Sequence, residues 1–210
     1  MKKIFCSVVL FSTLFGINAT QAAVIDFDVD LSSHFGNGNP YQEDGFQISN
    51  SKNNHDGLVF WGNDIGNWWS QHNADPGGNT LSHNYGGSTM TLTKIGGGLF
   101  DFNSIDLADI YNNGVEEDVQ FNFLFGDSST LQTTVTLDNL VGLQTFTFNQ
   151  FGLSQVSWTP LTTPGPFLQL DNIVVDASVS QVPIPAAVWL FGSGLVGLLG
   201  FNRKHAQAAA

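Results

Sequence analysis

The chain has little of what several common classes of protein need. It carries one cysteine, Cys6, so it cannot hold an internal disulfide. It has six lysines and arginines against 18 acidic residues. All the acidic residues lie between Asp26 and Asp176, where the only basic ones are Lys52 and Lys94. A surface with this charge repels phosphates, which excludes nucleic acid as a partner.

Marked catalytic motifs are also missing. Only three glutamates occur, and Glu116 and Glu117 are adjacent, so no pair of facing carboxylates is marked. The histidines between the two ends of the chain lack HExxH spacing. The stretch GDSS at 126–129 lies between two alternating segments, which favours a hairpin turn over a lipase nucleophile. We therefore predict a protein that is not an enzyme.

The first 22 residues have the pattern of a signal peptide. Lys2 and Lys3 precede the mostly apolar run from Ile4 to Ile17, and small residues lead to a cleavage site after Ala22. This predicts export with signal peptidase as a processing partner. A retained N-terminal anchor is the alternative.

Residues 23–179 are dominated by an alternation of period two, which predicts strands. In DVQFNFLF, apolar and polar residues alternate over 118–125, and Gly, Asn, Asp and Pro separate such runs. Further strands are predicted at VIDFDVDL, GFQIS, GLVFW, STMTLT, LFDF, SIDLADI, TLQTTVTL, QTFTF, QVSW and FLQLDNIVV. About ten short strands without a disulfide predict an all-β fold, an antiparallel β-sandwich of jelly-roll type.

The end of the chain is apolar again. Residues 186–201 carry no charge and would span roughly 24 Å as a helix, close to the thickness of a bilayer core. Arg203 and Lys204 follow, as is typical of a cytoplasmic end. We predict a linker with Pro183 and Pro185 at 180–185, a single transmembrane helix at 186–201 and a basic cytoplasmic tail at 202–210. A buried core helix is the alternative.

This tail, VPIPAAVWLFGSGLVGLLG followed by a basic cluster, resembles the PEP-CTERM sorting signal in its Val-Pro-x-Pro-Ala form. The resemblance implies a Gram-negative source that makes exopolysaccharide. It also implies processing by an exosortase, with transient anchoring in the inner membrane before release to the cell surface or the extracellular space. The residues that carry the motif are Val182, Pro183, Pro185, Ala186, Trp189, Gly192, Gly194, Arg203 and Lys204.

The order of YQEDGFQIS, FDFNSIDLAD, GLQTFTF, VSW and LQLDNIVV resembles jelly-roll domains of such exported proteins, and also non-catalytic carbohydrate-binding modules. In those modules the first and last strands lie together and often hold a structural calcium. Carboxylates suit such a hard cation, although the acidic row near the start could equally be a solvated strand face. The candidate calcium ligands are Asp26, Asp28, Glu43, Asp44 and Asp171.

The segment between residues 60 and 87 is long, aromatic and weakly patterned, which predicts a loop. Its Trp61, Trp68, Trp69 and Tyr85 could stack on sugar rings, or the loop could bury them over one end of the sandwich. The sequence thus predicts an exported structural or exopolysaccharide-associated protein of the cell surface or matrix. The alternatives are a carbohydrate-binding module with a specific glycan and, third, a hydrolase with unmarked aspartates.

Overall fold

The computed structural model describes residues 22–28, 40–52, 58–62, 70–83, 87–161 and 168–176. The chain divides into two compact units, residues 1–177 and 178–210, and the second lies wholly outside the described residues. The predicted signal peptide, sorting motif and terminal helix therefore fall outside the description. No helix among the described ranges is long and apolar enough to cross a membrane.

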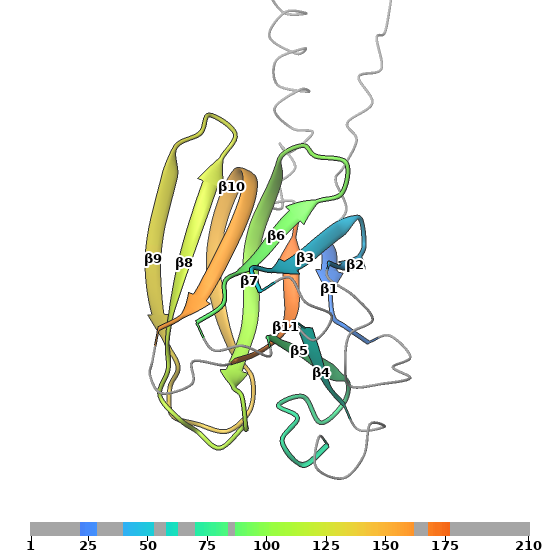
Figure 1. Cartoon of the computed structure of the whole chain (residues 1–210), viewed down its shortest axis with the longest axis vertical. Helices are drawn as coiled ribbons and strands as arrows, with labels where there is room; N and C mark the ends of the chain where they lie inside the picture. Colours follow the sequence, from blue (N-terminus) through green and yellow to red (C-terminus); the bar gives the residue numbers. More distant parts are fainter. Residues whose placement is uncertain are drawn as a thin grey trace, which may run out of the picture. The chain divides into compact units, whose positions relative to one another are not determined.

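The described part of the chain consists of antiparallel strands, as Figure 1 shows. Their bounds are β1 Ala23–Ile25, β2 Tyr41–Glu43, β3 Phe46–Asn50, β4 Leu58–Gly62, β5 Asn79–His83, β6 Met90–Lys94, β7 Phe100–Asp109, β8 Asp118–Phe125, β9 Thr130–Thr136, β10 Gln144–Pro160 and β11 Leu168–Val175. The all-β antiparallel sandwich predicted from the alternation is confirmed.

Two sheets are joined through the long strand β10. Its second half lies between β6 and β8 in a sheet ordered β2-β3-β6-β10-β8-β9. Its first half pairs with β7 in the other sheet, which continues through β11 to β5 and β4. The register of β10 with β7 shifts between Thr147 and Leu153. This irregular stretch is the bend at which β10 passes from one sheet to the other.

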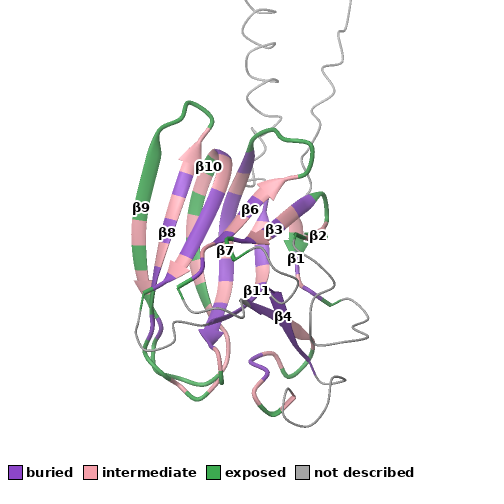
Figure 2. Cartoon of the chain, in the orientation of Figure 1, coloured by how far each residue is buried: buried purple, intermediate pink, exposed green. Residues whose placement is uncertain are grey.

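The space between the sheets is filled by the apolar residues of the alternating runs. In β8, Val119, Phe121 and Phe123 are buried while their neighbours are more exposed (Figure 2). Phe121 packs 4.6 Å from Phe148 of β10 and 6.0 Å from the buried ring of Trp158, measured between ring centroids. Phenylalanine is therefore abundant here because it fills this core.

Several predicted strands differ in extent from the observed ones. LFDF and SIDLADI form one strand, β7, and QTFTF and QVSW are the two halves of β10. The region predicted as one loop contains β5, which pairs with β4. The first strand ends early: Phe27 is buried but has φ 57°, a left-handed conformation that breaks the extended run.

Two smaller predictions are confirmed. β1 pairs with β11, so the first and last strands lie together. The GDSS stretch is the hairpin turn between β8 and β9, in which Ser129 donates both its N–H and its hydroxyl to Asp127. These hydrogen bonds lower the pKa of Asp127. Asp127 and Ser129 therefore stabilise the turn, and their arrangement is not that of a catalytic nucleophile.

Candidate functional site

Three loops meet at one end of the sandwich, the lower end in Figure 1: residues 70–78, 110–117 and 137–143. Asn112 joins all three. Its side-chain amide donates to the carbonyl of Asn73 at 3.3 Å, and its side-chain oxygen accepts the N–H of Gly142. Asn112 has φ 49°, a conformation that asparagine tolerates better than most residues. We call this region the loop end.

The 110–117 loop is built on a carboxylate. Asp109, the last residue of β7, is buried and accepts backbone N–H groups from four loop residues. The donors are Tyr111, Asn113, Gly114 and Val115, at 2.9 to 3.4 Å. Charge-assisted bonds of this kind are stronger than neutral ones, so Asp109 fixes the path of the loop.

Glu117 closes the same loop in an unusual state. Its side chain is buried, and its Oε1 has no hydrogen-bond partner. Burial, together with the nearby negative charge of Asp109, raises the pKa of Glu117 to about 8. At neutral pH the carboxyl of Glu117 is therefore protonated, which allows it to stay buried beside Asp109.

Three aromatic rings gather at the loop end. Trp61 of β4, His72 and Tyr111 lie edge-on to one another, with ring centroids 5.9 to 6.4 Å apart. Trp61 is buried and donates its indole N–H to the Ser82 hydroxyl at 2.8 Å, whereas Tyr111 is 45% exposed. Tyr111 thus presents a ring to solvent on a fixed aromatic base.

For Trp61 the structure shows the buried one of the two predicted alternatives. The ring is 3% exposed and cannot offer a face for stacking, because it supports the cluster from beneath. Trp68, Trp69 and Tyr85 lie outside the described residues, so their part in binding stays a prediction.

A buried glutamine anchors the cluster to the sheet. Gln169 of β11 accepts the N–H of Ala74 and donates to the carbonyls of His72 and Ile110. It also accepts the hydroxyl of Thr80 from β5. With its amide fully engaged and no exposed surface, Gln169 holds the loops that carry His72 and Tyr111 against the sheet.

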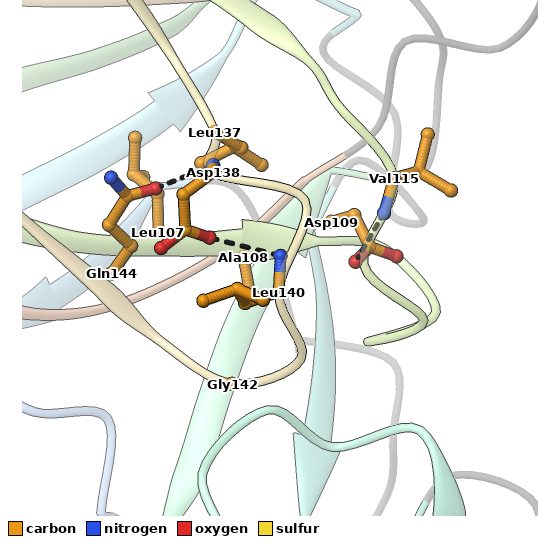
Figure 3. A pocket seen from close by; sticks show the side chains of 9 residues that line it. All are labelled: Leu107, Ala108, Asp109, Val115, Leu137, Asp138, Leu140, Gly142 and Gln144. Carbon is orange, nitrogen blue, oxygen red and sulfur yellow. Dashed lines mark hydrogen bonds between the residues drawn. The ribbon is translucent and has the colours of Figure 1, made fainter.

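Exposed aliphatic side chains lie on the same two loops as Tyr111 and Gly142. Val115 is 51% exposed, Leu140 68% and Val141 69%. Figure 3 shows Leu140 and Val115 at a shallow hollow whose wall includes Asp138 and Gln144. The N–H of Asp138 donates to Gln144 and its carboxylate accepts the N–H of Leu140, so the loop is braced by its own hydrogen bonds.

The predicted calcium ligands do not form one group. Glu43 is engaged by the Tyr41 hydroxyl at 2.8 Å and by the Phe27 N–H at 3.3 Å. Burial raises the pKa of Glu43, and these hydrogen bonds oppose the rise. Asp26 lies beside Glu43, and Asp44 is exposed in the turn between β2 and β3. Asp26 also accepts the N–H of Asp28 at 3.1 Å, which links it to the carboxylates described next.

A second acidic group, which we call the Gly78 cradle, includes Asp28, Asp75 and Asp171. A Cβ placed on Gly78 would come within 2.3 Å of Asp28 Oδ1 and 2.6 Å of Asp75 Oδ2, so both carboxylates face one point. Asp171 is buried, and burial raises its pKa to about 8. The hydrogen bond from Asn172 opposes this rise, while the charges of Asp75, Asp28 and Asp106 add to it.

The chemistry of the Gly78 cradle fits a hard cation, since its donors are oxygens. No three His, Cys, Asp or Glu side chains of the described ranges come together as a metal-binding group. Of the predicted ligands, the fold brings Asp28 and Asp171 near Asp75, and it brings Asp26 beside Glu43. Asp75 was not predicted, because it lies within the aromatic segment 60–87 and far along the chain from Asp28 and Asp171.

The loop end also holds residues that the sequence analysis did not single out. Tyr111 and Asn112 lie in YNNG, a turn composition that says nothing about exposure. A usable signal was LVG at 140–142, an apolar pair in a turn between two strands, where polar residues are the rule. The convergence of the two loops depends on the pairing of β7 with β10 and β11.

No protein-family model and no curated protein matches the chain. Several of the similar solved structures are carbohydrate-binding modules. The K1 cleaved adhesin domain of Lys-gingipain from Porphyromonas gingivalis W83 is 12% identical with TM-score 0.43, over 74% of this chain and 97% of that one. The CBM32-5 module from Clostridium perfringens, in complex with GalNAc-β-1,3-galactose, is 14% identical with TM-score 0.37, over 60% and 95%. A family 29 carbohydrate-binding module is 11% identical with TM-score 0.39, over 77% and 98%.

Proposed function

We propose that this chain is a non-catalytic glycan-binding protein whose contact surface is the loop end. The observation that carries this is the Tyr111 ring, 45% exposed and backed by the rings of His72 and buried Trp61. Sugar hydroxyls gain little net energy when they exchange water for protein, so recognition needs an apolar platform. Tyr111 supplies that platform.

The surroundings of Tyr111 suit a polysaccharide. Val115, Leu140 and Val141 add apolar area, and the exposed carboxylates of Glu116 and Asp138 offer acceptors to sugar hydroxyls. The acidic character of the domain favours a neutral or cationic glycan over a polyanionic one.

The test is retention of the exported protein on the exopolysaccharide of the producing cells. Tyr111→Ala removes the ring and should weaken retention about 5- to 30-fold, the effect of roughly 1–2 kcal/mol. Tyr111→Phe keeps the ring and should bind like the parent.

Phe151→Ala is the matched control, because Phe151 is 46% exposed and lies in the irregular stretch of β10 between Thr147 and Leu153, away from the three loops. Equal retention of folded Tyr111→Ala and the parent would contradict the assignment. Equal losses in Tyr111→Ala and Phe151→Ala would point to nonspecific adsorption.

The tail determines where the protein acts. Its Val-Pro-x-Pro-Ala motif, apolar run and basic cluster support sorting by an exosortase, with release from the inner membrane to the cell surface or matrix. Mass spectrometry of the exported protein tests this: the peptide 186–210 should be absent. Mature protein ending at Ala210 in cells with an active exosortase would refute it.

A structural calcium at the Gly78 cradle is part of the proposal. Asp28 and Asp75, whose carboxylates face one point, would supply two of its ligands, and the ion would offset the repulsion among Asp28, Asp75 and Asp171. The cradle lies where β5, β11 and the end of β1 come together. Removal of the calcium ion should therefore lower the stability of the domain and leave the sugar contacts in place.

A further inference from the structure

The strand β9 is an open edge of the sandwich. It pairs with β8 along its whole length without a bulge, and no other described strand pairs with it (Figures 1 and 2). Its seven residues, TLQTTVT, include no charge and no proline. Proteins usually protect edge strands with such features, because an unprotected edge is a template for another strand.

The hydrogen-bond pattern shows which groups point away from the sheet. At the hairpin the N–H of Phe125 donates to Ser129, and at the other end the N–H of Leu137 donates to Glu117. In an antiparallel pair such bonded positions alternate, so the odd-numbered residues of β9 bond to β8. The N–H and C=O groups of the even-numbered residues therefore face outward. They belong to Thr130, Gln132, Thr134 and Thr136.

We infer that β9 pairs with β9 of a second copy of this chain, antiparallel, across a two-fold axis at Thr133. In this register Gln132 lies opposite Thr134 and Thr130 opposite Thr136, which satisfies every outward group with roughly eight hydrogen bonds. Leu131, which is 42% exposed, then lies opposite Val135 of the second copy. The strand is self-complementary in both its backbone and its apolar row.

The interface is modest. A seven-residue strand is about 24 Å long, so we expect concentration-dependent association rather than a permanent dimer. Asp127 in the hairpin turn and Asp138 beyond the other end would approach across the axis and repel. Salt should therefore strengthen the dimer, unlike an interface held by ion pairs.

The experiment uses the exported protein, which loses Cys6 with the predicted signal peptide, so that an added cysteine is the only thiol. Thr133→Cys places the two thiols opposite each other at a Cα separation of about 4.5 Å, which a disulfide can bridge. Leu131→Cys is the control: on the same strand it is more exposed, but the two copies would lie about 14 Å apart. Mild oxidation should cross-link Thr133→Cys and leave Leu131→Cys monomeric.

Sedimentation velocity gives an independent measurement. The parent should move from monomer to dimer with rising concentration, and more so between roughly 0.02 and 0.3 M salt. Thr134→Pro removes an outward N–H and should stay monomeric, while Thr134→Val should dimerise like the parent. A parent that is monomeric throughout, with no cross-link at Thr133, overturns the inference; cross-linking of Leu131→Cys as readily as Thr133→Cys overturns the two-fold register.

Discussion

Replacing Glu117 with glutamine should stabilise the domain, and more strongly as the pH rises. Burial and Asp109 raise the pKa of Glu117 to about 8, while an unfolded glutamate titrates near 4.5. Between these values the folded state holds a proton that the unfolded state has released. The free energy of unfolding therefore falls as the pH rises from about 4.5 to about 8, and this group has no effect below that window.

The magnitude follows from the width of the window. At about 1.4 kcal/mol for each pH unit, the buried carboxyl costs about 3 kcal/mol at pH 7, as an order of magnitude. Glu117→Gln is nearly isosteric and stays neutral, so it should recover most of this. For a domain of this size the gain corresponds to a rise in Tm of roughly 6–12 °C at pH 7, and to a much smaller change at pH 4.5.

Thermal unfolding of the parent and the variant between pH 4.5 and 9 measures the effect. Taking the difference between the two proteins cancels the titration of Asp171, whose pKa is also raised. Glu116→Gln is the matched control, since Glu116 is the exposed neighbour and should change stability by less than about 0.5 kcal/mol. A difference between Glu117→Gln and the parent that does not vary with pH would refute the reasoning.

Two further predictions concern the other buried groups. Millimolar calcium should raise the Tm of the parent, increasingly so towards pH 8 as Asp171 ionises, and a chelator should reverse the rise. Asp75→Asn should abolish this response and Asp44→Asn should keep it, whereas an unchanged Tm of the parent would exclude a bound ion. Trp61→Phe should lower the free energy of unfolding, measured with denaturant, by about 1–3 kcal/mol, because the Ser82 hydroxyl loses its indole donor. The folded variant should be retained on polysaccharide like the parent, and lost retention at unchanged stability would show that Trp61 contacts the glycan.

The sandwich could be predicted from the sequence because apolar and polar residues alternate strongly within uninterrupted strands such as β8. The prediction failed where the backbone leaves the extended region for a local reason. Phe27 keeps the predicted burial but turns to φ 57°, so the strand that should run on to Leu31 ends at Ile25. Period two reports which face a side chain takes, and it does not report where a strand stops.

The candidate site was harder to predict because its parts lie far apart in the sequence. Trp61 is on β4 and Tyr111 follows β7, yet their rings meet. This is because β4 is joined to β11 through β5, while Gln169 of β11 holds Ile110, the residue before Tyr111. In LQLDNIVV, the polar Gln169 stands between two leucines, a pattern that predicts a side chain facing solvent. Only the loops folded over it make Gln169 a buried anchor.

Buried polar groups also make the loop end both rigid and sensitive to pH. An exposed ring is useful for binding only if the loop behind it is fixed, because an ordered platform loses little entropy when a ligand binds. Here the loop is fixed by Asp109, which accepts its N–H groups, and by the neighbouring buried Glu117, whose pKa is raised to about 8. Ionising Glu117 would set two negative charges against each other at the base of the loop that carries Tyr111. Retention on polysaccharide should therefore weaken above about pH 8 in the parent and persist in Glu117→Gln, so that a stability effect and a binding effect trace to one proton.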